Sequence, residues 1–522
     1  MSNEESSSAH RVAGRFDRCV ITLAVAAICL SLAARAFVTQ PVKGGDKLPG
    51  PAVVHREPTA EDDRRSGEDW PRFLGPQEDG VSRETQLLET WPSGGPPLIW
   101  EKTVGTGYSA PSVRGNQLVL HHRIKNEDVI ECMRADNGST LWTFRYPSDF
   151  TDPFGYNNGP RCTPLVTEQY CYTFGANGTL CCVEMATGKQ VWIRQTLKDF
   201  QVPDGFFGVG CTPILEGNLL ITLVGGQPDS GVVAFDARTG KTVWQSVGKS
   251  TWNGVETDEP GGERYKWTGE EMVVSYSSPL AVTIHGRRHV LCLVRQGLVS
   301  LDPQTGAENF KYWFRSRSQE SVNAARPVVV GDKIFISAAY RAGSALLQVA
   351  RDGKSCAELW RNTRNMLTHW STAIHVNGYL YGFSGRHERE GQLRCLELKT
   401  GKVVWASDGT EPVVGRVVFD QTTGGFQDRQ TGKPVPFPFY GRGSKIQTGN
   451  SFIVLGERGT LAKVTISAQG LKEQARASYK QIHYPAWTAP VLSRKRLYLR
   501  CEDALICLDL APVRPPKSGA DR

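Results

Sequence analysis

Short apolar stretches alternate with polar residues along most of this chain, and they recur around one turn motif. In the stretch Ala234–Trp244, AFDARTGKTVW, an alternating run precedes a Thr-Gly pair and a second run follows it. Alternation of apolar and polar residues predicts half-buried strands, and the glycine supplies the positive backbone angle of a tight turn. The motif therefore predicts a β-hairpin.

The same eleven-residue pattern begins again at Cys132, Cys182, Ser300 and Cys395, and a truncated copy begins at Cys507. Each complete copy has a glycine in its seventh position and an aromatic residue in its eleventh. The glycines are Gly138, Gly188, Gly240, Gly306 and Gly401, and the aromatic residues are Trp142, Trp192, Trp244, Phe310 and Trp405. This constant spacing indicates a repeated structural unit rather than unrelated turns.

A second marker, a short segment such as SAP or CTP, leads into an apolar strand before each predicted hairpin. Its eight occurrences lie at Pro111, Pro164, Pro213, Pro279, Pro327, Ala373, Ile446 and Pro490. Eight such openings predict an all-β fold, an eight-bladed β-propeller. The last copy ends at Leu510 without its aromatic strand, and the segment around Trp100 can supply one. We expect this N-terminal strand to complete the last blade and close the ring.

The start of the chain resembles a targeting segment. Three arginines precede an apolar stretch, Cys19–Ala34, which is typical of a signal peptide or a signal anchor. The positive flank predicts export to the periplasmic side, with the chain either anchored N-terminally in the membrane or secreted after cleavage. We predict a leader over residues 1–38 with a hydrophobic helix at about 19–38, a flexible linker over 39–68, the propeller over 69–512 and a disordered tail over 513–522.

The charge of the chain argues against a nucleic-acid partner. The net charge of +8 is mild for 522 residues and is spread along the chain, so it predicts a solvated surface and no nucleic-acid partner.

Two stretches depart from the repeat, at residues 250–273 and 406–440. Both are rich in glycine, proline or charge, and we expect them to be lengthened surface loops.

The thirteen cysteines show no pair or Cys/His cluster with zinc spacing, so the sequence predicts no metal site. Four of them occupy the first position of the repeat, where other copies have alanine or serine, which indicates a small buried side chain. The adjacent Cys181 and Cys182 are expected to be two strand thiols pointing to opposite sheet faces. The histidines, among them His121 and His122, are scattered and are expected at the surface.

The hairpin pattern resembles the tryptophan-docking repeat of quinoprotein-type (PQQ-like) β-propellers, closest to exported bacterial BamB-like or PQQ-binding-like repeat proteins. The resemblance covers nearly all of Asp69–Leu510. It implies that each tryptophan packs against the turn of a neighbouring blade. The family includes both pyrroloquinoline-quinone (PQQ) dehydrogenases and non-catalytic proteins, so the resemblance implies a fold and leaves the activity open.

The residues that differ between repeats lie just before the blade openings. In a propeller the innermost strands begin or end at one mouth of the axial channel, so these side chains are expected to converge there. The candidates are Tyr108, Arg161, Tyr276, Glu320, Asn323, Arg326, His369, Trp370 and Trp487. Arginines with aromatic residues favour an anionic or planar ligand, and the alternative is that they are packing residues along a water-filled axis. We expect replacement of Arg161 to leave stability nearly unchanged.

Dehydrogenase chemistry would require a calcium site beside the quinone and a carboxylate base. The sequence offers only Glu320 and Asn323 as a nearby acid and amide. No aspartate is paired with them, so we assign no catalytic residue. The sequence favours a monomeric scaffold that binds a protein partner at the cell envelope. The alternatives are a PQQ-dependent dehydrogenase, with PQQ and calcium, and a protein that binds a small anion or a carbohydrate.

Overall fold

The computed structural model describes residues 49–258, 264–268, 275–316, 321–410, 416–435 and 437–512. These residues belong to one compact unit, Asp46–Arg522. The predicted leader, with its helix at about 19–38, and the predicted tail over 513–522 lie outside the described residues. In the described part of the chain, no helix has the length and apolar character needed to cross a membrane.

Eight sheets of four or five strands contain most of the strand residues, and six of them consist of four consecutive antiparallel strands. These six sheets are β4 (Ser112–Arg114), β5 (Gln117–Ile124), β6 (Glu127–Arg134) and β7 (Thr140–Pro147); β8 (Leu165–Val166), β9 (Tyr170–Phe174), β10 (Thr179–Glu184) and β11 (Gln190–Gln195); β12 (Ile214–Glu216), β13 (Leu219–Gly226), β14 (Ser230–Asp236) and β15 (Thr242–Ser246); β18 (Leu280–Ile284), β19 (Arg287–Leu293), β20 (Gly297–Leu301) and β21 (Glu308–Trp313); β22 (Val328–Val330), β23 (Lys333–Ala338), β24 (Gly343–Val349) and β25 (Cys356–Asn362); and β26 (Ile374–Val376), β27 (Tyr379–Ser384), β28 (Gln392–Glu397) and β29 (Val403–Ser407).

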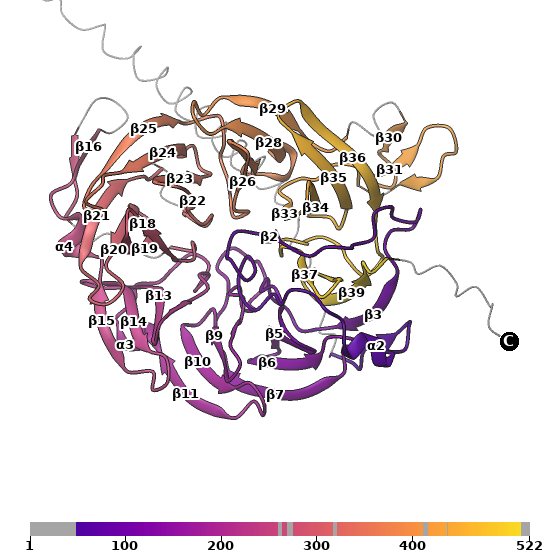
Figure 1. Cartoon of the computed structure of the whole chain (residues 1–522), viewed down its shortest axis with the longest axis horizontal. Coiled ribbons are helices and arrows are strands. Elements are labelled where there is room, and N and C mark those ends of the chain that lie inside the picture. The colour runs from indigo at the N-terminus through magenta and orange to yellow at the C-terminus, as the bar shows by residue number, and fades with distance from the viewer. Residues whose placement is uncertain are drawn as a thin grey trace, which may run out of the picture. The chain divides into compact units, whose positions relative to one another are not determined.

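The other two large sheets combine the two ends of the described chain. One contains β33 (Ser444–Thr448), β34 (Ser451–Leu455), β35 (Leu461–Ser467) and β36 (Gly470–Ala477), with β2 (Val81–Ser82) parallel to β33; the other contains β37 (Val491–Ser493), β38 (Arg496–Arg500), β39 (Ala504–Asp509), β3 (Leu98–Thr103) and β1 (Val53–Val54). Trp100 in β3 lies opposite Cys507 in β39. In Figure 1 the sheets surround a common centre, and the N-terminal β3 lies beside β39.

Neighbouring sheets are joined by an indole that packs on a glycine turn. Trp244 of β15 lies against the turn between β20 and β21, where a Cβ atom on Gly306 would come within 2.5 Å of its ring. The indole nitrogen donates a 2.9 Å hydrogen bond to the carbonyl of Pro303 in the same turn. The same contact joins Trp100 to Gly138, Trp142 to Gly188, Trp192 to Gly240 and Trp360 to Gly401.

Two positions of the repeat differ from this arrangement. Phe310 has no N–H group to donate, and the turn glycine of the next sheet, Gly353, lies instead against Arg287 and His289. Trp405 donates a 2.8 Å hydrogen bond to the carbonyl of Ser467, but the glycine of that turn has no neighbour within contact distance. The docking contact therefore varies around the ring.

The N-terminal segment Trp70–Ser82 runs along the inner ends of several sheets. Trp70 forms a bridge with Val113 of β4, and the nitrogen of Val166 in β8 donates to the carbonyl of Pro71. Val81 pairs with Gln447 of β33. Because these partners belong to three different sheets, the segment ties their inner ends together across the centre.

The chain enters this fold before Asp69, so the predicted linker over 39–68 is wrong over its second half. β1 pairs with β3, and the short helix α2 (Ala60–Asp63) is followed by Arg65, which forms a 2.8 Å ion pair with Asp509. Arg496 donates to the carbonyl of Asp62. Sequence pattern alone missed this part because β1 is only two residues long and the charged contacts that follow it are with the far end of the chain.

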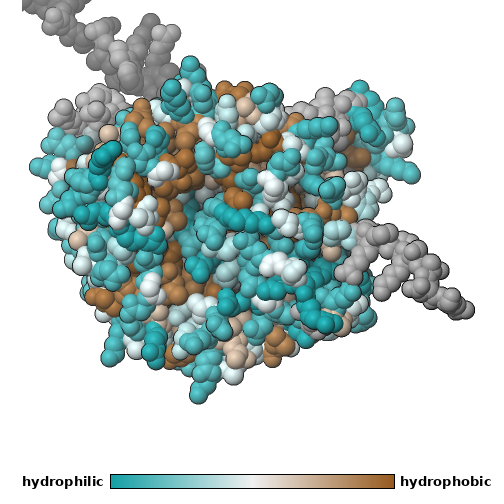
Figure 2. All heavy atoms as spheres, in the orientation of Figure 1, coloured by the Kyte–Doolittle hydropathy of each residue, from teal (hydrophilic) through white to brown (hydrophobic). Residues whose placement is uncertain are grey.

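The two stretches predicted as surface loops, residues 250–273 and 406–440, contain short strands. β16 (Glu256–Asp258) pairs with β17 (Arg264–Lys266), and a small sheet contains β30 (Val417–Asp420), β31 (Gly425–Asp428) and β32 (Pro434–Val435). The remaining helices are single turns, α3 (Thr196–Asp199), α4 (Lys249–Trp252) and η1 (Glu388–Glu390). Figure 2 shows one face of the molecule, where polar residues predominate and hydrophobic residues gather in patches between them.

The prediction that His121 and His122 lie at the surface is wrong. His121 and His122 are fully buried in β5, not at the surface. His121 forms a 2.9 Å hydrogen bond with the hydroxyl of Tyr146, and His122 accepts one from the nitrogen of Gly105. Burial lowers the pKa of both imidazoles. Cys181 and Cys182, in contrast, are buried free thiols of β10, as their strand position led us to expect.

Candidate functional site

A cavity of about 370 Å³ lies where the loops before the innermost strands meet. Six of the nine predicted site residues line it: Tyr108, Arg161, Tyr276, His369, Trp370 and Trp487. Phe73 and Leu74 of the central N-terminal segment also contribute to the lining. Loops from separate sheets therefore share one cavity, and the N-terminal segment supplies an apolar part of its wall.

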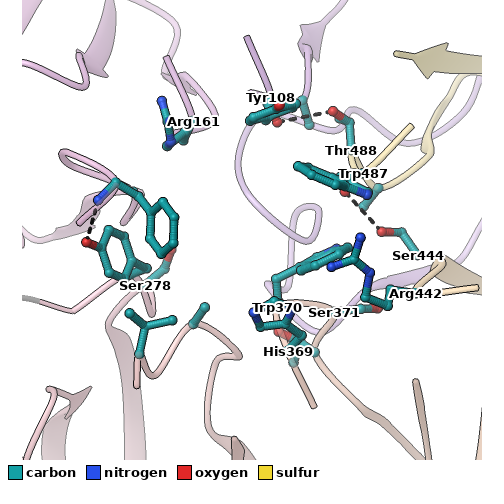
Figure 3. Close-up of a pocket in the computed structure, with 18 of the residues that line it drawn as sticks. Tyr108, Arg161, Ser278, His369, Trp370, Ser371, Arg442, Ser444, Trp487 and Thr488 are labelled. Carbon is teal, nitrogen blue, oxygen red and sulfur yellow. Dashed lines mark hydrogen bonds between the residues drawn. The ribbon is translucent and has the colours of Figure 1, made fainter. Parts of the chain in front are cut away.

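Aromatic rings form one continuous side of the cavity. The rings of Trp370 and Trp487 lie 5.3 Å apart, and Tyr108 and Tyr156 lie 5.0 and 5.5 Å from Trp487. Figure 3 shows Trp370 and Trp487 on one side of the cavity and Arg161 across from them. Such ring faces offer a flat apolar surface on which a planar ligand can stack.

Arg442 is a site residue that the sequence reasoning missed. Its guanidinium lies 5.0 Å from the centre of the Trp370 ring and 5.2 Å from that of Trp487. A bidentate pair with the fully buried carboxylate of Glu457, at 2.8 Å, holds it there. Trp487 donates a 3.0 Å hydrogen bond to the same carboxylate. One glutamate thus fixes both a cation and an aromatic ring of the wall.

Arg161 is held in a comparable way on the opposite side. It pairs with Asp152 at 2.5 Å and donates a 2.7 Å hydrogen bond to the carbonyl of Gly159. The Asp152 side chain is fully buried. Removing Arg161 would leave this carboxylate buried without its cation, which is costly. The contact therefore argues against our expectation that replacing Arg161 leaves stability nearly unchanged.

Lys445 is a second site residue that we did not predict. Its ammonium donates a 3.0 Å hydrogen bond to the carbonyl of Thr372 and lies near the rings of Phe383 and Phe452. Burial lowers the pKa of this amine to about 7. No carboxylate forms an ion pair with it among the described residues. An anionic ligand in the cavity would supply the missing charge partner.

The charges along the cavity have one sign. Arg161, Arg386, Arg442 and Lys445 line it, and no aspartate or glutamate of the described residues does. The carboxylates that neutralise Arg161 and Arg442 stand behind them, outside the lining. The cavity therefore presents cationic groups and aromatic faces to a ligand, a combination that favours anions with a planar part.

Two buried ring nitrogens of the cavity lining have no hydrogen-bond partner within the described residues, namely Nε1 of Trp370 and Nδ1 of His369. Buried polar groups of this kind normally have a partner. The other nitrogen of His369 lies 3.3 Å from the hydroxyl of Tyr340. Burial, aided by Arg442 and Arg386, lowers the pKa of His369 to about 3, so its ring is neutral at physiological pH. An indole N–H donor and a neutral imidazole are thus available to a ligand.

Of the predicted site residues that the structure describes, Asn323 and Arg326 do not line the cavity. Asn323 is buried and donates to the carbonyl of Val294 at 2.8 Å. Arg326 forms an ion pair with Glu78, which fastens the central N-terminal segment. The sequence correctly placed both residues just before an innermost strand, but their side chains contact other protein groups and do not line the cavity. Glu320 lies outside the described residues.

A family model and several solved structures resemble this chain. A family model described as outer membrane protein assembly factor BamB matches residues 125–407. Similar solved structures include BamB from Moraxella catarrhalis, with 14% identity, a TM-score of 0.47, and coverage of 82% of this chain and 99% of that one. Another is quinohemoprotein alcohol dehydrogenase from Comamonas testosteroni, with 14% identity, a TM-score of 0.45, and coverage of 89% and 84%.

No curated protein matches the sequence. The structural similarities carry no activity over to this chain, because their identities and TM-scores are low. The family model, however, spans more than half of the 522 residues and covers five of the repeats read from the sequence. The all-β sheets around a common centre and the docked tryptophans agree with it. The chain therefore belongs to the PQQ-like repeat family of β-propellers, the family of the BamB-like proteins.

Proposed function

We propose that this protein binds a small anion with a planar part in the cavity lined by Trp370, Trp487 and Arg442. The observation that carries the proposal is the lining itself, which has four basic side chains, a wall of aromatic rings and, among the described residues, no carboxylate. A ligand carboxylate or phosphate would pair with Lys445 or the arginines, and a planar group would stack on the indoles. The N–H of Trp370, which has no partner within the part of the chain that the structure describes, adds a donor.

The described residues do not fit the calcium–quinone arrangement of the dehydrogenases. Calcium prefers carboxylate and carbonyl oxygens as ligands, and a general base needs a carboxylate or a comparable group near the reacting carbon. The acids that hold Arg161 and Arg442, Asp152 and Glu457, are paired with these arginines and do not line the cavity. We therefore derive no oxidation step. PQQ itself, as a planar polycarboxylate, remains a ligand of the class that the lining favours.

A second candidate function is a protein-binding scaffold at the cell envelope. The match of residues 125–407 to the BamB family model favours it. In this proposal the eight sheets form an eight-bladed ring closed by the pairing of β3 with β39, and the predicted leader over residues 1–38 exports the monomer or anchors it on the periplasmic side. Affinity capture from membranes with the full chain should recover one stoichiometric partner, and recovery of none after mild solubilisation counts against the scaffold.

Calorimetric titration with three matched probes tests the ligand proposal. Naphthalene dicarboxylate is planar and anionic, naphthalene dimethanol is planar and neutral, and cyclohexane dicarboxylate is anionic and not planar. Only the first should bind measurably. Trp370→Leu should weaken that binding about 3- to 10-fold, because it removes one stacking face, and Phe419→Leu at an exposed position of β30 should leave it unchanged. Equal binding of all three probes, or of none, would refute the proposal.

A further inference from the structure

Three metal-ligating side chains meet outside the cavity, at one end of the last sheet. His483 lies in the connection between β36 and β37, and Cys501 and Asp503 lie in the connection between β38 and β39. One ligand atom from each of the three residues lies within 4.8 Å of the other two. Because the histidine is far from the other two in sequence, no short cysteine–histidine spacing marks this group.

The distances in this group agree with a tetrahedral metal site. Zinc–sulfur bonds of about 2.3 Å and zinc–oxygen or zinc–nitrogen bonds of about 2.1 Å place sulfur and oxygen ligands about 3.6 Å apart, and nitrogen and oxygen about 3.4 Å apart. Here Sγ of Cys501 lies 3.6 Å from Oδ1 of Asp503. Nε2 of His483 lies 2.9 Å from the same oxygen. A shift of a few tenths of an ångström in the half-exposed imidazole would reach the metal-bound spacing.

The surroundings of the imidazole fix its orientation. Nδ1 of His483 lies 3.0 Å from the backbone carbonyl oxygen of Tyr484, which can accept a hydrogen bond from it. Metal-bound histidines commonly make such a bond with the nitrogen that does not bind the metal. Nε2 then faces Asp503, and this is the nitrogen that would bind the ion. The backbone of Asp503 is itself held by a 2.8 Å hydrogen bond from the nitrogen of Val104.

The same geometry argues against a cysteine nucleophile activated by His483. In a nucleophile–histidine–acid triad the acid orients one ring nitrogen and the other accepts the proton of the nucleophile. In this protein Asp503 and the Tyr484 carbonyl occupy the two ring nitrogens of His483. Each ring nitrogen thus has an oxygen partner of its own, and the imidazole is also close to the Cys501 thiol. This three-way convergence differs from the linear order of a triad and suits a shared ion.

We propose that His483, Cys501 and Asp503 bind a divalent ion of the zinc type, with water as the fourth ligand. A thiolate with an imidazole and a carboxylate suits zinc and disfavours calcium and magnesium, which prefer oxygen ligands alone. The Cys501 sulfur is buried, whereas the His483 side chain is 45% exposed. The site is therefore open on the histidine side, where water or another small ligand has access to the ion.

The ion would tie two connections of the fold together. The His483 connection continues through Tyr484, whose ring packs 5.9 Å from that of Trp487 in the cavity wall. Binding of the ion would therefore stabilise the last sheet and the base of this wall. This site stands independently of the ligand proposed for the cavity, because it uses none of the residues that line it.

Metal titration of the full chain tests this site. After treatment with a chelator, zinc should bind at one ion per chain in competition with a chromophoric chelator, and cobalt should give the thiolate-to-cobalt charge-transfer band of a four-coordinate site. Cys501→Ser should abolish that band, and His483→Ala should weaken zinc binding by at least about 100-fold. Cys356→Ser, at a half-buried cysteine of β25, is the matched control and should change neither.

Each outcome decides the proposal. Zinc should also raise the melting temperature of the wild-type chain and leave that of His483→Ala unchanged. His483 is half-exposed, so this variant should fold even if Cys501→Ser does not. Absence of saturable zinc binding would overturn the assignment. Stoichiometric binding that persists in His483→Ala, or a cobalt band lost in Cys356→Ser, would also overturn it by placing the ion elsewhere.

Discussion

Replacement of Gly306 by alanine tests the contact between neighbouring sheets, and the chain offers a matched control in the same sheet. Gly306 lies in the turn between β20 and β21, with a φ of +71°, and Gly286 lies in the turn between β18 and β19, with a φ of +78°. A Cβ atom on Gly286 meets nothing within 4 Å, whereas one on Gly306 would lie 2.5 Å from the Trp244 ring. The two substitutions therefore differ in one contact.

The structure gives the size of the expected difference. Alanine at a positive φ costs about 1–2 kcal/mol at either position. Carbon atoms pack best at about 3.5–4.0 Å, so at Gly306 the indole must retreat by about 1 Å. Overpacking of this kind costs about 1–3 kcal/mol, and loss of the Trp244–Pro303 hydrogen bond costs about 1 kcal/mol more. Gly306→Ala should thus be about 2–4 kcal/mol less stable than Gly286→Ala.

Guanidinium chloride unfolding, followed by tryptophan fluorescence, measures this difference directly. For a folded unit of this size the entropy of unfolding is on the order of 1 kcal/mol/K, so the melting temperatures of the two variants should differ by about 2–4 °C. Equal midpoints for the two alanine variants, both slightly below wild type, would refute the reasoning. That result would mean that the indole yields to the new methyl group without cost.

Three further substitutions test other parts of the structure. Trp100→Phe removes the indole hydrogen bond to the carbonyl of Ala135 and should lower the unfolding free energy by about 1–2 kcal/mol. An unchanged midpoint in urea would contradict a docking role for the indole of β3. Burial lowers the pKa of Lys445 to about 7, so above this pH the unfolded chain binds more protons than the folded chain does. The stability of the wild type relative to Lys445→Met should therefore rise by a few kcal/mol between pH 7 and 10. Parallel pH profiles of the two proteins would show that the amine is solvated. Arg326→Met removes the buried partner of Glu78 and should speed hydrogen exchange across residues 70–82, whereas unchanged protection would mean that other contacts hold this segment.

The repeat could be predicted from the sequence because its contacts follow a constant spacing. Gly240 and Trp244 are four residues apart, and this interval recurs in the other complete copies. In the folded chain the indole of one sheet packs on the turn glycine of the next sheet. Trp360 escaped prediction because the glycine of its own hairpin, Gly353, precedes it by a longer interval. It nevertheless docks on Gly401 and donates to the carbonyl of Leu398.

The cavity was only partly predictable. Position before an innermost strand identified Trp370 and Trp487, but it does not determine where a side chain points, and Arg326 turns to Glu78 instead. Arg442 stands just before β33 and Lys445 near its start, at the weakest of the eight openings, where no proline marks the strand. Their significance depends on burial and on which carboxylates lie behind the wall. Neither property follows from local pattern.

A structure of the full chain with bound naphthalene dicarboxylate tests the central claim most directly. We expect the naphthalene ring to lie against Trp370 and Trp487, with a carboxylate within hydrogen-bond distance of Lys445 or of the arginines that line the cavity. The N–H of Trp370, which has no partner among the described residues, should gain one. A cavity that holds only water at a saturating concentration of the probe, or a probe bound at another surface, would contradict the claim that this cavity is a site for planar anions.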